Sequence, residues 1–317
     1  MRMSTSAESS KDTKRQMLDA QICNAPLEAL PQQLRDTNED LMTGIDEAGR
    51  GPTIGPMVYG AAIAPVSRES DLRKMGFDDS KQLTETKRDE LWAATRKCGW
   101  LGWKVRVLHA AEISGGRLRR HKPYNLNAQS HDAAIGMVRW VLEQGVNLRH
   151  LYVDTVGDPA MYKAKLESIF PNLQITVAPK ADSLYPIVSA ASICAKVPRD
   201  TILANWRFED AALCQDRDWG CGYPGDDACR AWLKRHLQPI FGYPDVVRFC
   251  WGPIAEVLEK NPDANGACVV RWPDDEEDPS LAWQRESMAA FLGKRKRAAV
   301  ERHKVYGECD LEAVEGF

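Results

Sequence analysis

The sequence lacks the features that staple small secreted domains or anchor a chain in a membrane. It has nine cysteines but no Cys-x-x-Cys pair, and the odd number argues against both a disulfide framework and a zinc site. No run approaches the roughly 18 consecutive apolar residues of a transmembrane helix, and the N-terminus lacks the apolar core of a signal peptide. We therefore expect an intracellular protein with reduced thiols and no membrane contact.

An excess of one charge is also missing, because 42 basic and 45 acidic residues give the 317-residue chain a formal net charge of -3. Hydrophobic residues make up 44% and charged residues 27%, which is ordinary for a globular protein and excludes disorder as the main state. Basic residues gather locally, however, between Arg96 and Lys122, where Glu112 is the single acid. This basic segment either binds a polyanion in a salt-dependent way or is a solvated basic surface.

Five apolar runs predict β-strands after a polar leader. Residues 1–38 are weakly periodic, so we expect a poorly ordered leader, and its acids Glu8, Asp12 and Asp19 argue against a mitochondrial presequence. Helices are predicted at 84–99 and 125–145. This order predicts a mixed sheet, antiparallel first and parallel later, covered by helices. The predicted strands are 41–46, 56–65, 99–108, 148–154 and 173–179.

The second half of the chain is predicted to be mainly helical. A long helix is expected from Leu184, with Ser183 as its N-cap and Pro186 in its tolerant first turn. Further helices are expected at 226–237 and 253–260, followed by an acidic linker from Trp272.

Acidic residues terminate three of the predicted strands. Asp46 and Glu47 close the first strand and lead into a Gly-Arg-Gly turn, Asp154 closes the fourth strand, and Asp182 follows the fifth. Strand ends are where α/β sheets place their chemistry, and such ends can lie side by side. The spacing therefore predicts a single cluster of four carboxylates.

Such a cluster predicts a metal site. Four neighbouring carboxylates cannot all stay ionised unless cations sit among them, and oxygen ligands suit magnesium or manganese rather than zinc. Two such ions about 4 Å apart would activate a water and stabilise the leaving oxygen of a phosphodiester. Taken singly, Asp154 could cap a turn, Asp182 could favour a helix N-terminus, and Glu47 could be solvated. Folding alone explains poorly why three apolar strands end in acids.

Long ordered motifs extend this pattern along most of the chain. They are GIDEAGRGPTIGPMVYG (44–60), DDSKQL (78–83), YNLNAQSHD (124–132), YVDTVGD (152–158), KADSLYPIVSAASICAKVPRD (180–200) and GCGYPGD (220–226). These motifs resemble those of type 2 ribonuclease H, the ribonuclease HII family, and within it the catalytic A subunits of the eukaryotic heterotrimeric enzymes. The resemblance covers about Leu41 to Leu258.

The resemblance implies an α/β ribonuclease H-like fold, a mixed five-stranded sheet flanked by helices with a helical C-terminal extension. With the composition of the leader, it predicts a leader at 1–38, a catalytic domain at 39–205, a helical part that grips the substrate at 206–271, and an acidic linker and basic tail at 272–317 that contact partner subunits. It also implies that Asp46, Glu47, Asp154 and Asp182 are catalytic and bind Mg²⁺, with Mn²⁺ as a substitute. The implied reaction is hydrolysis of RNA in RNA–DNA hybrids, and incision 5′ of single ribonucleotides in duplex DNA, leaving 3′-hydroxyl and 5′-phosphate ends.

The resemblance further implies a set of substrate contacts. Family members sense the 2′-hydroxyl, which distinguishes RNA from DNA, with the Gly-Arg-Gly turn and a tyrosine. The implied cations either hold phosphates or lie on a solvated helix surface, and Asn125 either contacts nucleic acid or caps a helix. The implied substrate-binding residues are Gly49, Arg50, Gly51, Lys81, Asn125, Asn127, Lys196, Arg199 and Tyr223.

Other expectations concern roles outside this set. His131 lies on the apolar stripe of a helix and is expected to be a core histidine rather than a base. The implied partners are an RNA–DNA hybrid, ribonucleotide-containing duplex DNA and two non-catalytic subunits. We expect a nuclear protein that acts in ribonucleotide removal, replication and repair. The run from Lys294 to Arg297 is either a nuclear localisation patch or a solvated helix face.

Two alternatives belong to other classes. A catalytically silent protein that binds hybrids as part of a complex would be free to lose an acid, yet all four acids are present. Another nuclease or strand-transfer enzyme of the same fold would need no 2′-hydroxyl sensor, so the tyrosine and the Gly-Arg-Gly turn argue against it.

Overall fold

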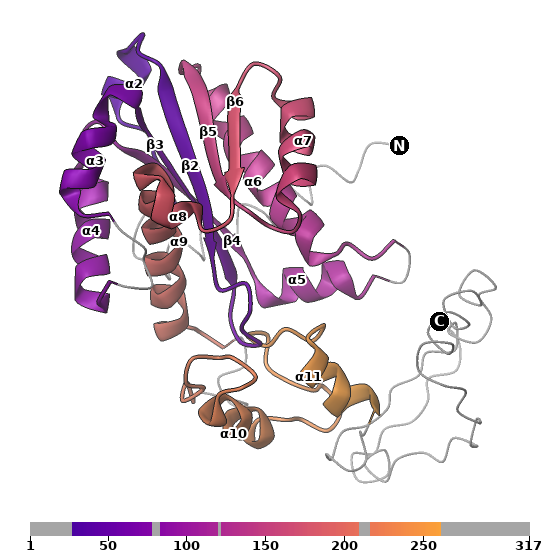
Figure 1. The fold of residues 1–317 in the computed structure, drawn as a ribbon. Helices are drawn as coiled ribbons and strands as arrows, with labels where there is room; N and C mark the ends of the chain where they lie inside the picture. The colour runs from indigo at the N-terminus through magenta and orange to yellow at the C-terminus, as the bar shows by residue number, and fades with distance from the viewer. Residues whose placement is uncertain (1–26, 78–82, 120–121, 209–215, 261–317) are drawn as a thin grey trace, which may run out of the picture.

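The computed structural model describes residues 27–77, 83–119, 122–208 and 216–260. A mixed six-stranded sheet runs through it in the order β1-β4-β3-β2-β5-β6 (Figure 1). β2, β3 and β4 pair antiparallel, whereas β5 and β6 continue the sheet parallel to β2, which confirms the expected mixed sheet. The strands are β1 (Glu28–Ala29), β2 (Leu41–Ala48), β3 (Met57–Pro65), β4 (Gly102–Leu108), β5 (Leu148–Asp154) and β6 (Gln174–Ala178).

The sixth strand corrects the expected count of five and shortens the expected leader. Residues 28–36 are expected to be poorly ordered, but they form β1, which pairs with β4, and the short helix α2 (Gln32–Asp36). The reason is apolar packing, since Leu34 is buried and its side chain, with that of Leu30, lies over Gly102. Residues 1–26 lie outside the described part of the chain.

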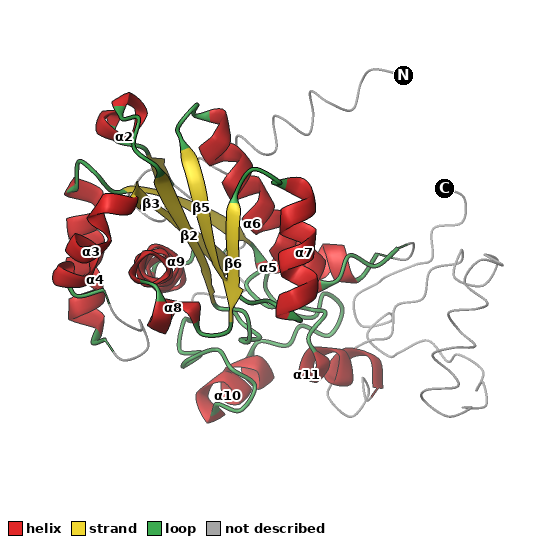
Figure 2. Ribbon diagram, turned by 45° about the horizontal axis from the view of Figure 1, so that its top comes forward, coloured by secondary structure: helices red, strands yellow, loops and turns green. Residues whose placement is uncertain are grey.

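Helices cover both faces of the sheet (Figure 2). One face carries the short 3₁₀ turn η1 (Val66–Arg68) and the helices α3 (Glu69–Met75), α4 (Glu85–Lys97), α8 (Ala181–Leu184) and α9 (Pro186–Ala204); the other carries α5 (Ala110–Arg117), α6 (Leu126–Glu143) and α7 (Pro159–Ile169). Each face has its own apolar core, one around Trp103 and Ile187 and one around Tyr59 and Val138. Of these helices, α3, α5 and α7 were not expected from the sequence. Side chains of Thr84, Asn125 and Asp158 cap α4, α6 and α7.

The long helix begins later than expected. The one-turn helix α8 ends at Leu184, and α9 starts at Pro186 with no side-chain cap, so Ser183 does not cap it. Tyr185 between them is extended, with φ −121° and ψ 116°. Proline disfavours the helical conformation of the residue before it, which explains the break. Leu184 is consequently 55% exposed instead of lying on the buried face.

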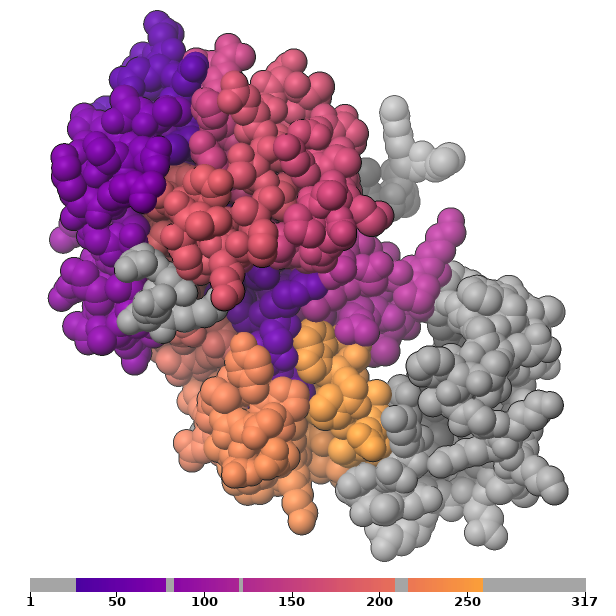
Figure 3. Space-filling view, viewed as in Figure 1, coloured from indigo at the N-terminus to yellow at the C-terminus, as the bar shows by residue number. Residues whose placement is uncertain are grey.

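The C-terminal part (residues 216–260) lies beneath the sheet, against the loop that follows β2 (Figure 3). It contains α10 (Asp227–Arg235), α11 (Gly252–Ala255) and the π-helical turn η2 (Glu256–Lys260). Backbone hydrogen bonds join it to that loop, from Thr53 N to Gly222 O (2.8 Å), Gly55 N to Val246 O (2.7 Å) and Arg248 N to Thr53 O (2.9 Å). The expected helical extension is therefore packed directly on the loop that carries the Gly-Arg-Gly turn. No helix among the described residues is long and apolar enough to span a bilayer.

Two glycines allow α9 to pack with its backbone against the sheet. A Cβ at Gly44 of β2 would lie 2.3 Å from the carbonyl oxygen of Ile187. A Cβ at Gly60 of β3 would lie 2.2 Å from the carbonyl oxygen of Ala191. Side chains at these positions would force the helix away, because backbone atoms cannot move aside as a flexible side chain can.

We expect Gly60→Ala to lower the free energy of unfolding by about 3 kcal/mol, the upper part of the range for overpacked cores. Urea denaturation measures this change. Gly136→Ala is the matched control, since Gly136 lies in α6 with nothing within 4 Å of its added Cβ. The control should gain up to about 1 kcal/mol from helix propensity. An unchanged midpoint for Gly60→Ala would show that α9 is not in close contact with β3.

Candidate active site

The sheet brings three of the predicted acids to one edge. The parallel register pairs Ile45 with Val153, so the next residues, Asp46 and Asp154, leave adjacent strands together. Asp154 in turn pairs with Ala178, the last residue of β6, and Asp182 follows in α8. Asp46 and Asp182 are buried, with 5% and 4% of their surface exposed. Asp46 and Asp154 thus lie at neighbouring strand ends, and Asp182 follows the end of the next strand by four residues; the single cluster of four carboxylates stays a prediction.

Backbone amides orient these carboxylates. Asp46 Oδ1 accepts from Glu47 N (2.7 Å), and Asp182 Oδ1 accepts from Ser183 N (3.0 Å). Asp154 Oδ1 accepts from both Thr155 N (3.1 Å) and Ala181 N (3.0 Å). Asp154 therefore caps its own turn, as one interpretation holds, and also ties the end of β5 to the residue next to Asp182.

Repulsion between carboxylates perturbs the site. Burial, followed by the charges of Glu47 and Asp154, raises the pKa of Asp46 well above its ordinary value. Hydrogen bonds from the Ser192 side chain of α9 and from Glu47 N lower it only in part. Asp46 thus lies buried beside other acids, which favours binding of a cation there.

The donor set fits a hard divalent ion in type, but it does not enclose one. Among the residues that the structure describes, no group of three or more His, Cys, Asp or Glu side chains is arranged to hold a metal by itself. Magnesium sites commonly use one or two carboxylates and complete their ligand shell with water and substrate phosphate. An open set of carboxylates at the rim of the sheet matches that kind of site better than a closed protein cage.

The Gly-Arg-Gly turn (residues 49–51) follows the strand that bears Asp46 and lies between α9 and Tyr223. Gly49 has φ +80°, and its Cβ would lie 2.9 Å from Arg199 Nε. A Cβ at Gly51 would lie 2.8 Å from Tyr223 Cε1. Only glycines fit, because the turn passes between α9 on one side and the tyrosine ring on the other. The structure therefore brings Tyr223, 49% exposed, to the turn as predicted.

Residues 43–253 match the family model described as Ribonuclease HII. The chain belongs to the ribonuclease HII family. The A subunit of ribonuclease H2 from Bos taurus is 47% identical over 239 residues, which cover 75% of this chain and 78% of that protein. The solved ribonuclease H2 from Pyrococcus horikoshii OT3 covers 68% of this chain and 96% of its own, with a TM-score of 0.56 and 29% identity. The structure of Bst ribonuclease HIII in complex with Mn²⁺ shares the fold at 19% identity, with a TM-score of 0.50 over 70% of each chain.

Membership confirms the resemblance seen in the motifs, including the similarity to the A subunits. As a member of the ribonuclease HII family the chain is an endoribonuclease, and the ribonuclease H family depends on a divalent metal. The six-stranded mixed sheet flanked by helices is the ribonuclease H-like fold of its solved neighbours.

Sequence reasoning missed the residue that holds the turn in this ribonuclease. Arg248 is fully buried in the C-terminal part and donates to the carbonyl oxygens of Gly55 (2.9 Å from Nε), Arg50 (2.9 Å from Nη1) and Gly49 (2.5 Å from Nη2). Its guanidinium lies 4.8 Å from the ring centre of Trp251, whose Nε1 donates to Gly51 O (3.0 Å). Burial lowers the pKa of Arg248 to about 9. A single arginine in an unremarkable segment carries no sequence signal for this role.

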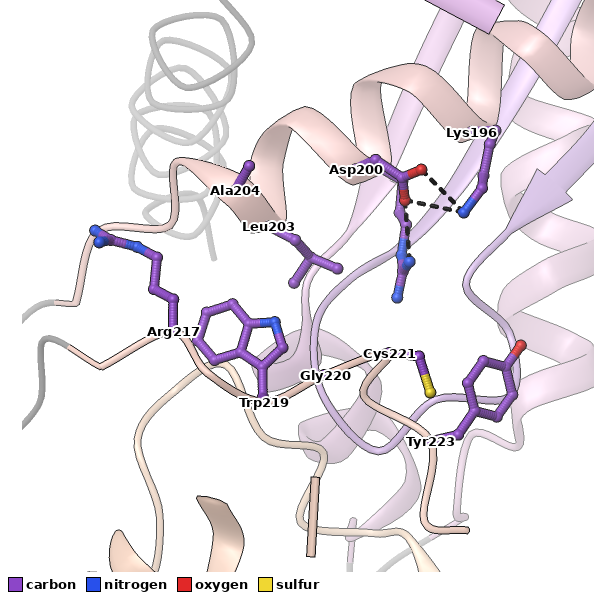
Figure 4. A pocket seen from close by; sticks show the side chains of 10 residues that line it. Lys196, Asp200, Leu203, Ala204, Arg217, Trp219, Gly220, Cys221 and Tyr223 are labelled. Carbon is purple, nitrogen blue, oxygen red and sulfur yellow. Dashed lines mark hydrogen bonds and ion pairs between the residues drawn. The ribbon is translucent and has the colours of Figure 1, made fainter. Parts of the chain in front are cut away.

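A basic hollow continues from the turn (Figure 4). Its volume is about 360 Å³, and it is lined by Lys196, Arg199, Asp200, Leu203, Ala204, Arg217, Trp219, Gly220, Cys221 and Tyr223. Asp200 accepts from Lys196 Nζ and from Arg199 Nη1 (3.1 Å), so both predicted cations are held in place. Arg199 is 7% exposed, and its Nε and Nη2 have no hydrogen-bond partner among the described residues. The predicted Lys81 lies outside the described residues.

Three other predicted residues have structural partners. Asn125 caps α6 by accepting from Ala128 N (2.9 Å), which confirms the capping interpretation. Asn127 accepts from Arg50 Nη2 rather than standing free beside the site. His131 Nε2 lies 3.1 Å from Val156 O, its ring stacks on Tyr162, and burial lowers its pKa, so it is a core histidine as expected.

The basic segment from Arg96 to Lys122 is only partly a free surface. Lys104 pairs with Glu28 of β1 and lies over Trp140, and Arg106 pairs with Glu112 (2.9 Å). Arg117 instead stacks on Trp251, next to the Gly-Arg-Gly turn. Binding of a polyanion therefore stays a prediction for the part of this segment near Arg117.

Arg248→Gln should lower the free energy of unfolding by roughly 3 kcal/mol, because buried carbonyl groups lose their donor. Urea denaturation of the purified chain measures this loss. Arg73→Gln is the control, since Arg73 makes an exposed ion pair with Glu69 and should cost less than about 1 kcal/mol. Equal losses in the two variants would contradict the role of Arg248.

Without metal, the stability of the protein should fall as pH rises toward neutrality. A carboxyl whose folded pKa is raised contributes stability below its unfolded pKa of about 3.9, and that contribution is lost as pH rises through the folded pKa. Asp46→Asn should therefore flatten the decline measured by urea denaturation in EDTA between about pH 4 and pH 8.

Asp71→Asn is the control of opposite sign. Hydrogen bonds from Arg68 and Lys74 lower the pKa of Asp71. The stability that this carboxylate contributes is therefore present above about pH 4 and is lost in acid. If the free energy of unfolding declined equally with pH in wild type and in Asp46→Asn, Asp46 would not be the carboxyl group with the raised pKa.

Proposed function

We propose that this endoribonuclease hydrolyses the RNA strand of RNA–DNA hybrids and incises duplex DNA 5′ of single ribonucleotides, leaving 3′-hydroxyl and 5′-phosphate ends. The observation that carries the proposal is the contact between the Tyr223 ring and Gly51, directly beside the strand that bears Asp46. A half-exposed phenol at this place can meet a sugar 2′-hydroxyl, the group that separates RNA from DNA. The name of the bovine relative, a ribonuclease H2, supports the same substrate class.

In the proposed mechanism, Asp46, Glu47, Asp154 and Asp182 hold Mg²⁺, which Mn²⁺ can replace. Bound there, a pair of divalent ions would supply an activated water and neutralise charge on the leaving oxygen. Ser192 and the backbone N–H groups of Glu47 and Ala181 keep the carboxylates oriented before substrate arrives. This pre-organisation lowers the cost of assembling the site during the reaction.

In this proposal, backbone N–H groups of the Gly-Arg-Gly turn face the substrate. Arg248 and Trp251 donate hydrogen bonds to the carbonyl oxygens of residues 49–51. No acceptor for the N–H groups of Arg50 or Gly51 occurs within the described part of the chain. These donors, with the Tyr223 hydroxyl, are suited to oxygen atoms of a ribonucleotide and its phosphate. Lys196 and Arg199 would hold a neighbouring phosphate in the basic hollow.

We also propose that the chain works within a hetero-oligomer that contains two non-catalytic subunits, because its bovine relative is named as one lettered subunit of ribonuclease H2. Nuclear localisation, and a role in ribonucleotide removal during replication and repair, are proposed from the resemblance of the motifs to the eukaryotic A subunits and from the basic run Lys294–Arg297. The residues expected to carry these roles, 272–317 with Lys294–Arg297, lie outside the described residues.

The decisive experiment is Mg²⁺-dependent nicking of an end-labelled duplex that carries one ribonucleotide, with an all-DNA duplex as control. Wild type should nick 5′ of the ribonucleotide, and Asp46→Asn should bind without cleaving. Tyr223→Ala should lose about tenfold more rate on this duplex than on a long hybrid, the size of one lost hydrogen bond.

Cleavage of the all-DNA duplex, or wild-type turnover by Asp46→Asn, would contradict the proposal. Equal losses for Tyr223→Ala on both substrates would remove its sensing role. A chain that nicks only within its purified natural complex would show that the partner subunits are obligatory.

A further inference from the structure

The side chain of Arg50, in the middle of the Gly-Arg-Gly turn, is held by helix α6. Its Nη1 donates to Ser130 Oγ (2.7 Å), and its Nη2 donates to Asn127 Oδ1. Ser130 and Asn127 are three residues apart on a helix, so they lie on one face and grip the two ends of the planar guanidinium. Ser130 is fully buried, which fixes this end of the contact.

We propose that Asn127 and Ser130 are positioning residues for ribonucleotide recognition: they anchor Arg50 and thereby hold the Gly-Arg-Gly turn against Tyr223. This inference rests on the proposed function and deepens it. It replaces the expectation that Asn127 contacts nucleic acid directly.

Electrostatics explains why an anchor is needed. Arg248, Arg199 and Arg50 lie close enough for both neighbouring cations to lower the pKa of Arg248. Arg248 holds the carbonyl group of Arg50 while its charge repels the Arg50 side chain. An unanchored guanidinium would swing away and pull on the turn, whereas neutral acceptors on α6 hold it without adding charge.

The anchor also reaches the strand end that bears Asp154. The loop after β5 contains Gly157, with φ +82°, and a Cβ there would lie 3.2 Å from Asn127 Nδ2. The Asn127 amide thus lies between the loop that follows Asp154 and the arginine of the Gly-Arg-Gly turn, which it binds. Ser130 binds the same arginine from the next turn of α6.

The test compares removal of the acceptor with its replacement. Asn127→Ala and Ser130→Ala should each lower kcat about tenfold on a duplex with one ribonucleotide, with KM changed less than about twofold. Asn127→Asp keeps an acceptor oxygen for Arg50 and should stay within about threefold of wild type. In an Arg50→Ala background, adding Asn127→Ala should change kcat less than about twofold, because both act through one arginine.

Asn147→Ala is the matched control. Asn147 also joins two segments, donating to Asn38 O (3.2 Å) and Asp40 Oδ1 (3.0 Å), but at the opposite end of the sheet. It should lower the melting temperature without changing kcat, which separates positioning from general stability.

The other possible results would contradict either the positioning role of Asn127 and Ser130 or the proposed function. If Asn127 touched nucleic acid directly, Asn127→Asp would raise KM strongly, since a carboxylate repels phosphates, and Ser130→Ala would behave as wild type. Wild-type kcat in both alanine variants, or full additivity with Arg50→Ala, would also overturn the inference while leaving the proposed function intact. A wild-type chain and natural complex that nick nothing would overturn the proposed function and the inference with it.

Discussion

The contact between α9 and the sheet sets where Asp46 lies relative to the α9 side chains of the site. Gly44 and Gly60 let the helix backbone approach β2 and β3 until no Cβ fits between them. Asp46 follows Gly44 by two residues on the same face of β2, and it meets Ser192 of the helix. Ser192 and Lys196 are four residues apart, so the hydroxyl that meets the carboxylate and the cation of the basic hollow share one helix face. One packing distance therefore sets the spacing between the carboxylates and the cations.

Burial of charge at two points opposes this close packing. Asp46 is buried among acids, and Arg248 is buried among arginines. Each costs folding free energy, because a charge withdrawn from water must be compensated by its neighbours. Arg248 is compensated by three carbonyl groups and an aromatic ring, whereas the compensation of Asp46 by protein groups is incomplete. The difference marks the charge of Arg248 as structural, whereas the charge of Asp46 is the one that the proposed metal would compensate.

The sequence predicted the parts of the site that follow from local pattern. Apolar runs that end in Asp46 and Asp154 were sufficient to place these acids at neighbouring strand ends, because parallel strands expose their ends together, and Asp182 follows the next parallel strand. It could not predict Arg248, because no periodicity links a single arginine to carbonyl groups almost two hundred residues earlier in the chain. The partner of Asn127 was hidden for the same reason. The short strand β1 was missed because a polar, two-residue strand depends on the strand beside it.

The Gly-Arg-Gly turn shows why these long-range contacts matter for chemistry. Its conformation is held by two distant parts of the chain. Helix α6 binds the Arg50 side chain, and the C-terminal part binds the carbonyl groups through Arg248 and Trp251 and packs Tyr223 on Gly51. A turn with glycine at both ends has little intrinsic preference for one shape, so its order must come from such contacts. The same glycines that make the turn mobile in isolation leave space for a ring and a guanidinium to lie against its backbone. The recognition that we propose for its backbone groups therefore depends on the rigidity that the rest of the fold supplies.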